Sequence, residues 1–143
     1  MSLTDRAVLL GVRLGREIDG IRELEVVGRR SGKARRTPVK VLEVDGQRYV
    51  VSLSGSSGWV CNLRERETAR LRIGRHVEDV VATELPDAQK PPIVRAYLEA
   101  ATRPGTRERL AWAADGAPEA NVQRGAASVP VFRLTARSVI AEA

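Results

Sequence analysis

The chain has 143 residues, of which 43% are hydrophobic and 29% charged, and its formal net charge at pH 7 is +6. This length suits one domain with a core of its own, and the composition is that of an ordinary globular protein. Two Trp, two Tyr and one Phe are too few for an aromatic platform that stacks single-stranded nucleic acid. The single Cys excludes an internal disulfide.

Residues 3–18 are predicted to form an amphipathic helix. Leu3, Ala7, Leu10 and Leu14 recur at the spacing of one helix face, with arginines elsewhere on the wheel. We expect this stripe to pack over a sheet edge, and the helix to be dispensable for chemistry; a basic helix resting on a membrane surface is the alternative. The chain lacks an apolar run of membrane-spanning length and a signal-peptide pattern, so a cytoplasmic location is expected, with contact at the inner face of the membrane as the variant.

Alternating apolar residues predict three strands in the next part of the chain, over residues 22–28, 36–44 and 47–53. Asp45-Gly46, between the second and third strands, is a strong signal for a two-residue hairpin turn. We expect the three strands to form a meander.

A strongly basic turn separates the first two predicted strands. Residues 26–42 contain six cations and no acid, so this window carries a charge equal to that of the whole chain. Ser31 and Gly32 mark the turn itself, since Gly tolerates a positive φ and Ser hydrogen-bonds locally. Backbone N–H groups beside several guanidinium groups suit a phosphate or a cluster of carboxylates. A solvated, charged hairpin tip is the alternative.

Residues 54–58, Ser-Gly-Ser-Ser-Gly, predict a polar loop, and residues 59–67 a short helix that begins on it. The N-terminus of this helix offers free N–H groups to an anion or an electron-rich carbonyl. Residues 69–74 and 77–85 predict another pair of strands.

The last third is predicted from its prolines and its apolar runs. Pro91-Pro92 indicates the start of a helix, and residues 104–128 are expected to be irregular or partly helical. Residues 129–136 predict a final strand, with Pro130 favouring a position at the sheet edge. About six strands with late helices predict a small antiparallel barrel with peripheral helices.

The sequence lacks the usual catalytic constellations. One His and one Cys cannot supply common zinc ligands, and nothing places His76 near a serine nucleophile. Phosphate-binding loops of the Walker and Gly-x-Gly-x-x-Gly types are missing too. This scarcity of catalytic side chains fits an enzyme whose phosphorylated cofactor carries the chemistry better than it fits a hydrolase. A pure binding module is the alternative.

Several motifs together carry a family resemblance. They are Gly28-Arg29-Arg30-Ser31-Gly32, Arg35, Thr37-Pro38, the Asp-Gly hairpin and Trp59-x-x-Asn62-Leu63. In this combination the chain resembles the deazaflavin-dependent nitroreductase family, flavin and deazaflavin oxidoreductases related to the pyridoxamine phosphate oxidase fold. The resemblance runs from about residue 23 to 85 and more weakly through the final predicted strand. It implies an α+β fold: a six-stranded antiparallel split β-barrel with peripheral helices, as one domain over residues 1–143, with the helix of residues 1–20 packed outside the barrel.

The resemblance also implies a cofactor and a set of site residues. The cofactor is coenzyme F420, a deazaflavin with a phosphate and an anionic polyglutamate tail, with flavin mononucleotide (FMN) as the alternative. The implied cofactor-binding residues are Arg29, Arg30, Ser31, Gly32, Arg35, Thr37, Pro38, Ser54, Gly55, Trp59 and Asn62. Asn62 is expected to fix the loop of residues 54–58 by hydrogen bonds. We expect Trp59 to wall the acceptor site, with Tyr97 and Trp112 as further candidates for substrate binding.

The implied function is transfer of hydride from reduced F420 to an electron-poor acceptor such as a quinone, an enone or a nitro compound. The loop before Trp59 is shorter than in the nitroreductase type, and Val60 stands where that type has Tyr, which counts against bulky nitro drugs. An FMN-dependent reductase of the same fold, or a non-enzymatic module that binds anions or nucleic acid, is the alternative. No metal and no nucleic acid are expected as partners, and the sequence determines neither the physiological acceptor nor the oligomeric state.

Overall fold

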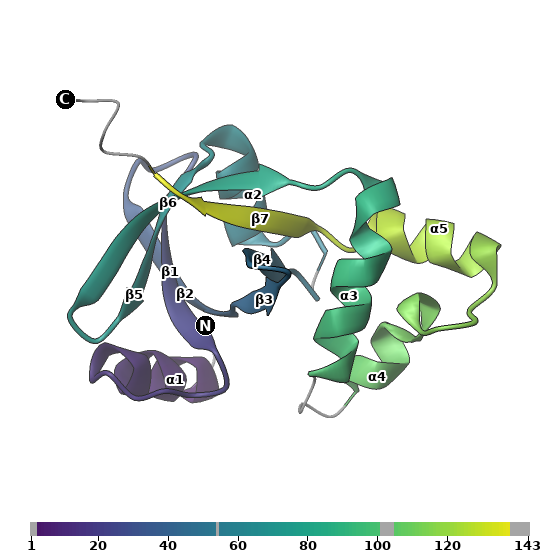
Figure 1. Ribbon diagram of the computed structural model, residues 1–143. Helices are drawn as coiled ribbons and strands as arrows, with labels where there is room; N and C mark the ends of the chain where they lie inside the picture. Colours follow the sequence, from purple (N-terminus) through teal and green to yellow (C-terminus); the bar gives the residue numbers. More distant parts are fainter. Residues whose placement is uncertain (1–2, 54, 101–104, 138–143) are drawn as a thin grey trace.

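The computed structural model describes residues 3–53, 55–100 and 105–137, and at its centre lies one antiparallel sheet of seven strands (Figure 1). The strands are β1 (Ile21–Val27), β2 (Ala34–Lys40), β3 (Leu42–Val44), β4 (Gln47–Val51), β5 (Thr68–Ile73), β6 (His76–Glu84) and β7 (Val131–Ala136). Their order across the sheet is β2-β1-β5-β6-β7-β4-β3, and every pair is antiparallel.

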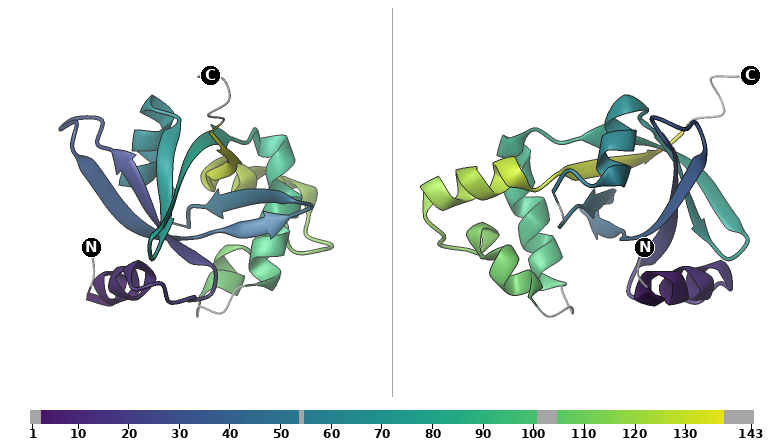
Figure 2. Two further views of the ribbon diagram at one scale, coloured as in Figure 1. Left: turned by 60° about the vertical axis from the view of Figure 1, so that its left-hand side comes forward. Right: turned by 180° about the vertical axis from the view of Figure 1, so that it is seen from behind.

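The sheet is curled. β2 and β3 lie at opposite ends of the strand order although only Val41 separates them along the chain. The two ends must therefore approach each other, and β2 contacts β4, as Figure 2 shows from two further directions. The Val41 N–H leaves the ladder and donates to the Gly20 carbonyl at 3.0 Å.

This break corrects two of the expectations. The α+β class is confirmed, but seven strands replace six because the predicted strand 36–44 divides at Val41. The meander is wrong, since β3 pairs with β4 whereas β2 pairs with β1 at the other end of the sheet.

Two tight turns and one strand pair were predicted correctly. At the β3–β4 hairpin Asp45 and Gly46 have φ of 51° and 77°, as a type I′ turn requires. β5 and β6 form the expected pair.

The edge position inferred from Pro130 is wrong, because β7 lies between β6 and β4. Pro130 precedes the first residue of β7, so its missing N–H disturbs no hydrogen bond of the ladder. The Pro130 carbonyl accepts from the Ser52 N–H at 2.9 Å.

The helices flank this sheet. They are α1 (Leu3–Arg13), α2 (Gly58–Glu65), α3 (Lys90–Glu99), α4 (Thr106–Arg109) and α5 (Glu119–Ser128), with short 3₁₀ turns at Asp87–Gln89 (η1) and Ala111–Ala113 (η2). Figure 1 shows α3, α4 and α5 gathered at one side of the molecule, with α1 at the other. Pro91 and Pro92 occupy the first turn of α3, as expected. Within the described part of residues 104–128, helical turns and connecting segments alternate; residues 101–104 lie outside it.

α1 buries a different face from the predicted one. It packs against β1, β2 and β5 through Leu9 and Val12. The predicted stripe faces solvent instead: Leu3, Leu10 and Leu14 are 82%, 60% and 70% exposed. An ion pair accompanies the buried face: Arg13 donates from Nε to the buried carboxylate of Glu23 at 2.7 Å. Among the described residues no helix is long and apolar enough to cross a membrane.

The core has two parts. One fills the curl of the sheet beneath α2 and includes Leu24, Val50, Leu63 and Phe132. The other lies between β4, β7 and the helices on that side, and includes Tyr97 and Leu110. The first part supports the basic turn and α2, and the second positions α3.

Candidate functional site

The basic hairpin tip is built by short-range hydrogen bonds. The Gly28 N–H donates to the Lys33 carbonyl at 2.8 Å, and the Gly32 N–H donates to the Gly28 carbonyl at 2.9 Å. Gly32 has a φ of +69°, which explains a glycine at this position. Ser31 Oγ accepts from the Lys33 N–H at 3.2 Å. The expected tight turn is therefore present between β1 and β2.

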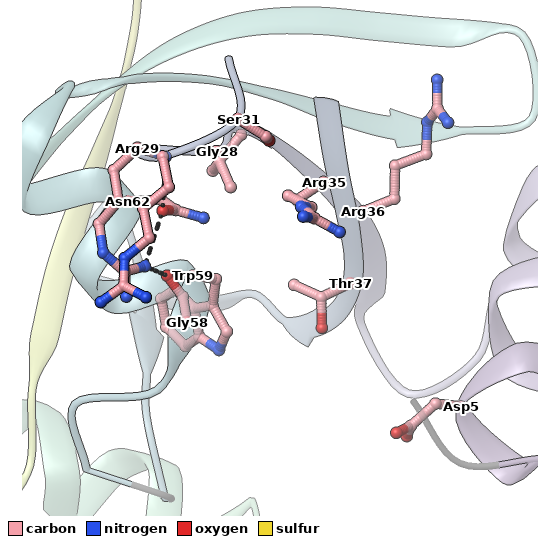
Figure 3. Close-up of a pocket in the computed structure, with 12 residues that line it drawn as sticks. Asp5, Gly28, Arg29, Ser31, Arg35, Arg36, Thr37, Gly58, Trp59 and Asn62 are labelled. Carbon is pink, nitrogen blue, oxygen red and sulfur yellow. Dashed lines mark hydrogen bonds between the residues drawn. The ribbon is translucent and has the colours of Figure 1, made fainter. Parts of the chain in front are cut away.

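Asn62 of α2 holds this turn in place across a separation of 33 residues. Its buried Oδ1 accepts from the Arg29 backbone N–H and from the Arg29 guanidinium, both at 3.0 Å (Figure 3). The same guanidinium lies 3.5 Å from the Gly58 carbonyl. Asn62 thus makes loop-fixing hydrogen bonds, but to the basic turn rather than to residues 54–58.

Arg64, in the last turn of α2, makes a second set of anchoring contacts. This side chain makes two hydrogen bonds, of 2.9 and 2.6 Å, to the Glu84 carboxylate of β6, and a third to Ser56 Oγ at 2.9 Å. The hydrogen bonds to Glu84 raise the pKa of Arg64 above its ordinary value. α2 is consequently held by contacts to both the basic turn and β6.

A cleft of about 490 Å³ opens between the basic turn, β2 and the start of α2 (Figure 3). Its walls come from β1 and the turn, from β2, from α2 and from Asp5 of α1; the residues are Asp5, Val26, Gly28, Arg29, Arg30, Ser31, Arg35, Arg36, Thr37, Gly58, Trp59 and Asn62. Four of these twelve are arginines and one is an acid. Such a wall favours an anionic ligand.

The arginines of the cleft are not equivalent. Arg36 pairs with Glu25 across the β1–β2 ladder, Nε to Oε2 at 3.0 Å, and in Figure 3 it turns away from the cleft. Arg29 is committed to Asn62. Within the described part of the chain, Arg30 and Arg35 are exposed and have no acidic partner. These two guanidinium groups are therefore available to a ligand.

Trp59 separates this cleft from a second cavity of about 190 Å³. The tryptophan ring packs against Phe132 with centroids 6.1 Å apart, so part of it belongs to the core, while the residue also lines both cavities. The second cavity is lined by Asp5, Val8, Asp19, Ile21, Pro38, Val39, Lys40, Val51, Ser52, Leu53, Ser57, Trp59 and Tyr97.

The structure brings most predicted site residues to these two cavities. Thr37 lines the first and Pro38 the second, because neighbouring residues of β2 point to opposite faces. Gly32 and Gly55 shape their turns with positive φ and line neither cavity. Ser54 lies outside the described residues.

The three candidate substrate-binding residues do not lie in one cavity. Trp59 and Tyr97 meet at the second cavity, Tyr97 arriving from α3. Trp112 does not join them: it lines another cavity between η2 and α5, where its ring lies against Gly125 so closely that a Cβ there would be 2.1 Å from it.

Sequence reasoning did not single out several polar residues of the second cavity, among them Asp5, Asp19, Lys40 and Ser52. Lys40 Nζ donates to Asp19 Oδ2 at 3.1 Å and to the Ala100 carbonyl at 2.9 Å, and lies 5.8 Å from the centre of the Tyr97 ring. The alternation along β2 was the available signal for Lys40; nothing local pointed to Asp5. In the described ranges no group of three or more His, Cys, Asp or Glu side chains could hold a metal ion.

Comparison with known proteins adds a family and a fold. The sequence profile of a family described as F420H(2)-dependent quinone reductase matches residues 3–107. No curated protein matches the sequence.

Several solved structures share the fold. One described as a domain-swapped dimer is 21% identical, with a TM-score of 0.58, over 91% of this chain and 92% of its own. An F420-H2 dependent reductase, FDR-A, is 21% identical, with a TM-score of 0.55, over 81% of this chain and 94% of its own. A putative pyridoxamine 5'-phosphate oxidase from Listeria innocua is 12% identical, with a TM-score of 0.55, over 92% and 93%.

Proposed function

This chain belongs to the F420H(2)-dependent quinone reductase family, and from this premise we propose that it transfers hydride from reduced coenzyme F420 to a small quinone-type acceptor. It is an oxidoreductase whose cofactor is coenzyme F420. The observation that carries the proposal is the cleft with the two available guanidinium groups, beside a smaller cavity whose lining shares Asp5 and Trp59 with it.

The donor set of the cleft fits the cofactor. F420 carries a phosphate and an acidic tail, and the cleft offers Arg30 and Arg35, the hydroxyls of Ser31 and Thr37, and Gly58 at the N-terminus of α2. An added Cβ at Gly58 would meet nothing within 4 Å, so the cleft is open there. We assign the phosphate and tail of F420 to the basic turn and β2, and its ring system to the region beside Trp59. The curled sheet that holds these elements is assigned as a split β-barrel.

The chemistry divides between cofactor and protein. When bound, the reduced deazaflavin supplies the hydride. Arg30 and Arg35 bind the anionic part, while Asn62 keeps Arg29 and the turn in position. Trp59 and Tyr97 form apolar walls that exclude water and orient a flat acceptor.

The direct test is reduction of a quinone under anaerobic conditions. Purified protein is mixed with reduced F420 and menadione, and the return of the oxidised deazaflavin absorbance is followed. We expect turnover that saturates in both substrates. Failure of every quinone, enone and nitro acceptor, together with failure of F420 to bind, contradicts the proposal.

The choice between cofactors is tested by titration. F420 and FMN are compared by fluorescence quenching with the same protein sample. We expect F420 to bind at least tenfold more tightly, because it has an acidic tail for the cations that a mononucleotide phosphate leaves unused. Equal or tighter binding of FMN would favour the FMN-dependent alternative.

A further inference from the structure

The outer side of α1 carries most of the large apolar side chains that are exposed in the described part of the chain. These side chains are Leu3, Leu10, Leu14 and Val77. Leu3 and Leu10 belong to α1, and the Leu14 N–H donates to the Leu10 carbonyl at 3.0 Å, so Leu14 continues the helical turn on the same side. Single exposed apolar residues are ordinary on a protein surface, whereas a group of them on one face marks an interaction site.

The turn between β5 and β6 extends this surface. The Gly74 N–H donates to the Val12 carbonyl at 2.7 Å, and a Cβ on Gly74 would lie 3.0 Å from the Gly15 Cα, so the backbones of the turn and of the end of α1 are in contact. Figure 1 shows the tip of this hairpin beside α1, and Figure 2 shows the same arrangement from behind. The turn carries the exposed Arg75, and the exposed Val77 follows it in β6.

Three cations on this part of the molecule are exposed and have no acidic partner among the described residues: Arg6, Arg16 and Arg75. The acids nearby are engaged elsewhere. Glu17 pairs with Arg22 at 3.1 Å, and Asp19 pairs with Lys40 at 3.1 Å. Asp5, the acid of α1, points toward the cleft in Figure 3. The exposed leucines are therefore accompanied by positive charge that the protein itself does not neutralise.

We call this surface the α1 face; its residues are Leu3, Arg6, Leu10, Leu14, Arg16, Arg75 and Val77. Leucines beside uncommitted arginines suit the surface of an anionic bilayer, where apolar side chains enter the boundary below the head groups and cations reach the lipid phosphates. A second copy of the chain suits the face less well, because like charges would meet. A stable protein interface also takes about 800 Å² from each partner, more than one short helix with three leucines provides.

We propose that the α1 face binds the surface of an anionic lipid bilayer, with α1 lying in the plane of the interface. The leucines supply the apolar contact and the arginines the attraction to negatively charged head groups. Because α1 also borders the cleft through Asp5, this binding holds the cleft close to the bilayer. The inference does not depend on the reaction that the cleft carries out.

Vesicle sedimentation with the full chain tests the proposal. One set of vesicles contains phosphatidylcholine alone, and the other an equal mixture of phosphatidylcholine and phosphatidylglycerol. We expect the protein to sediment with the mixed vesicles, to remain largely in solution with phosphatidylcholine alone, and to be released from the mixed vesicles as the salt concentration rises. A protein that stays in solution with both vesicle types overturns the proposal.

The apolar contribution is tested by the double variant Leu10→Gln/Leu14→Gln. Both side chains are exposed, so we expect the melting temperature to stay that of the wild type. The affinity for mixed vesicles is expected to fall roughly tenfold or more, because two side chains no longer transfer from water into the interface. An unchanged vesicle affinity in this variant excludes the leucines from the contact.

The charge contribution is tested by Arg6→Gln and Arg75→Gln. Each is expected to weaken binding to mixed vesicles about fivefold, the effect of one cation near an anionic surface. The matched control is Arg66→Gln, which removes the same charge from an exposed position at the end of α2, on the side of the molecule away from α1 (Figure 2). We expect this control to change the affinity by less than about twofold.

Two further results overturn the assignment. If Arg66→Gln weakens vesicle binding as much as Arg6→Gln does, the net charge of the chain and not the α1 face is responsible. If analytical ultracentrifugation shows a dimer that Leu10→Gln/Leu14→Gln converts to a monomer, the face joins two copies of the chain. F420 titration of the same variants separates this proposal from the proposed function, since we expect the cofactor to bind to all of them as it binds to the wild type.

Discussion

At the scale of single residues, the site depends on which polar groups are already committed. Arg29 is engaged by Asn62 and Arg36 by Glu25, whereas Arg30 and Arg35 have no acidic partner among the described residues. The run of six cations seen in the sequence therefore divides into groups that build the cleft and groups that can bind a ligand. Each class responds differently to mutation.

Arg35→Ala is expected to weaken F420 binding tenfold or more and to leave kcat at saturation nearly unchanged. Loss of a charge-assisted hydrogen bond to a phosphate or carboxylate costs about 1.5–3 kcal/mol. Fluorescence titration and steady-state kinetics measure the two effects. Arg70→Ala serves as the control, since Arg70 is exposed and pairs with Asp79 at 2.9 Å on another part of the sheet. A fall in kcat with unchanged F420 affinity would contradict the assignment.

Asn62→Ala is expected to lower both stability and F420 affinity. Its Oδ1 accepts two hydrogen bonds from Arg29, so the substitution leaves that N–H unsatisfied and releases the basic turn, at a cost of about 1–3 kcal/mol in the free energy of unfolding. Denaturant unfolding measures the loss.

The matched control is Asn121→Ala, which removes an exposed Asn–Arg hydrogen bond of 2.7 Å on α5. We expect little change from it. Equal effects of the two variants would mean that the Asn62–Arg29 contact does not hold the turn.

At the scale of elements, the spacing of apolar residues in α1 predicted the wrong buried face. It has apolar residues on two faces, and the face with the more regular spacing is the exposed one. The buried face is chosen by its partners: Gly11 allows close approach, since a Cβ there would meet Ile18 Cδ1 at 2.9 Å, and Arg13 reaches Glu23. Asp5 of α1 lines both cavities, so the helix also contributes to the site; its expected dispensability for chemistry stays a prediction.

Leu9→Ala is expected to destabilise the protein by about 2–4 kcal/mol, whereas Leu10→Ala should change stability by less than about 0.5 kcal/mol. Leu9 is 7% exposed and Leu10, its neighbour in the same helix, is 60% exposed. Denaturant unfolding of both variants measures the difference. The reverse order would place the predicted stripe, not Leu9 and Val12, against the sheet.

At the scale of the whole molecule, curling of the sheet joins parts that are distant along the chain. Arg48 of β4 makes two hydrogen bonds of 2.7 Å to the carboxylate of Glu78 in β6, across the strand order. These bonds lower the pKa of Glu78 below its ordinary value of 4.5 and raise that of Arg48. The pair therefore makes the stability of the curled sheet depend on pH.

Glu78→Gln is expected to lower stability at pH 7 by about 1 kcal/mol, with a difference from wild type that shrinks as the pH falls below 4.5. A carboxylate whose pKa is lower in the folded than in the unfolded chain contributes stability above the unfolded-state pKa, and that contribution is lost as the pH falls through the folded-state pKa. Melting temperatures of both proteins from pH 7 to pH 3 measure it. Glu67→Gln, at an exposed position, controls for the change in net charge. A difference independent of pH would exclude the Glu78 carboxylate as its cause.

The sequence by itself determined what short-range physics decides. Both hairpin turns, the strand pair β5–β6 and the first turn of α3 follow from glycine, proline and alternation within a few residues. The cationic cleft wall was also predicted, from the run of cations, and Trp59 and Asn62 beside it were implied by the family resemblance.

Only the tertiary structure decided what depends on long-range closure of the chain. The break at Val41, the interior position of β7 and the buried face of α1 follow from which surfaces meet when the sheet curls, and local propensity does not contain that information. The second cavity likewise exists because α1, β2, α2 and α3 converge, so that Asp5, Lys40, Ser57 and Tyr97 line the same cavity. Burial and hydrogen-bond partnership are properties of the packed chain, so the engagement of Arg29 by Asn62 and of Arg36 by Glu25 becomes visible only there.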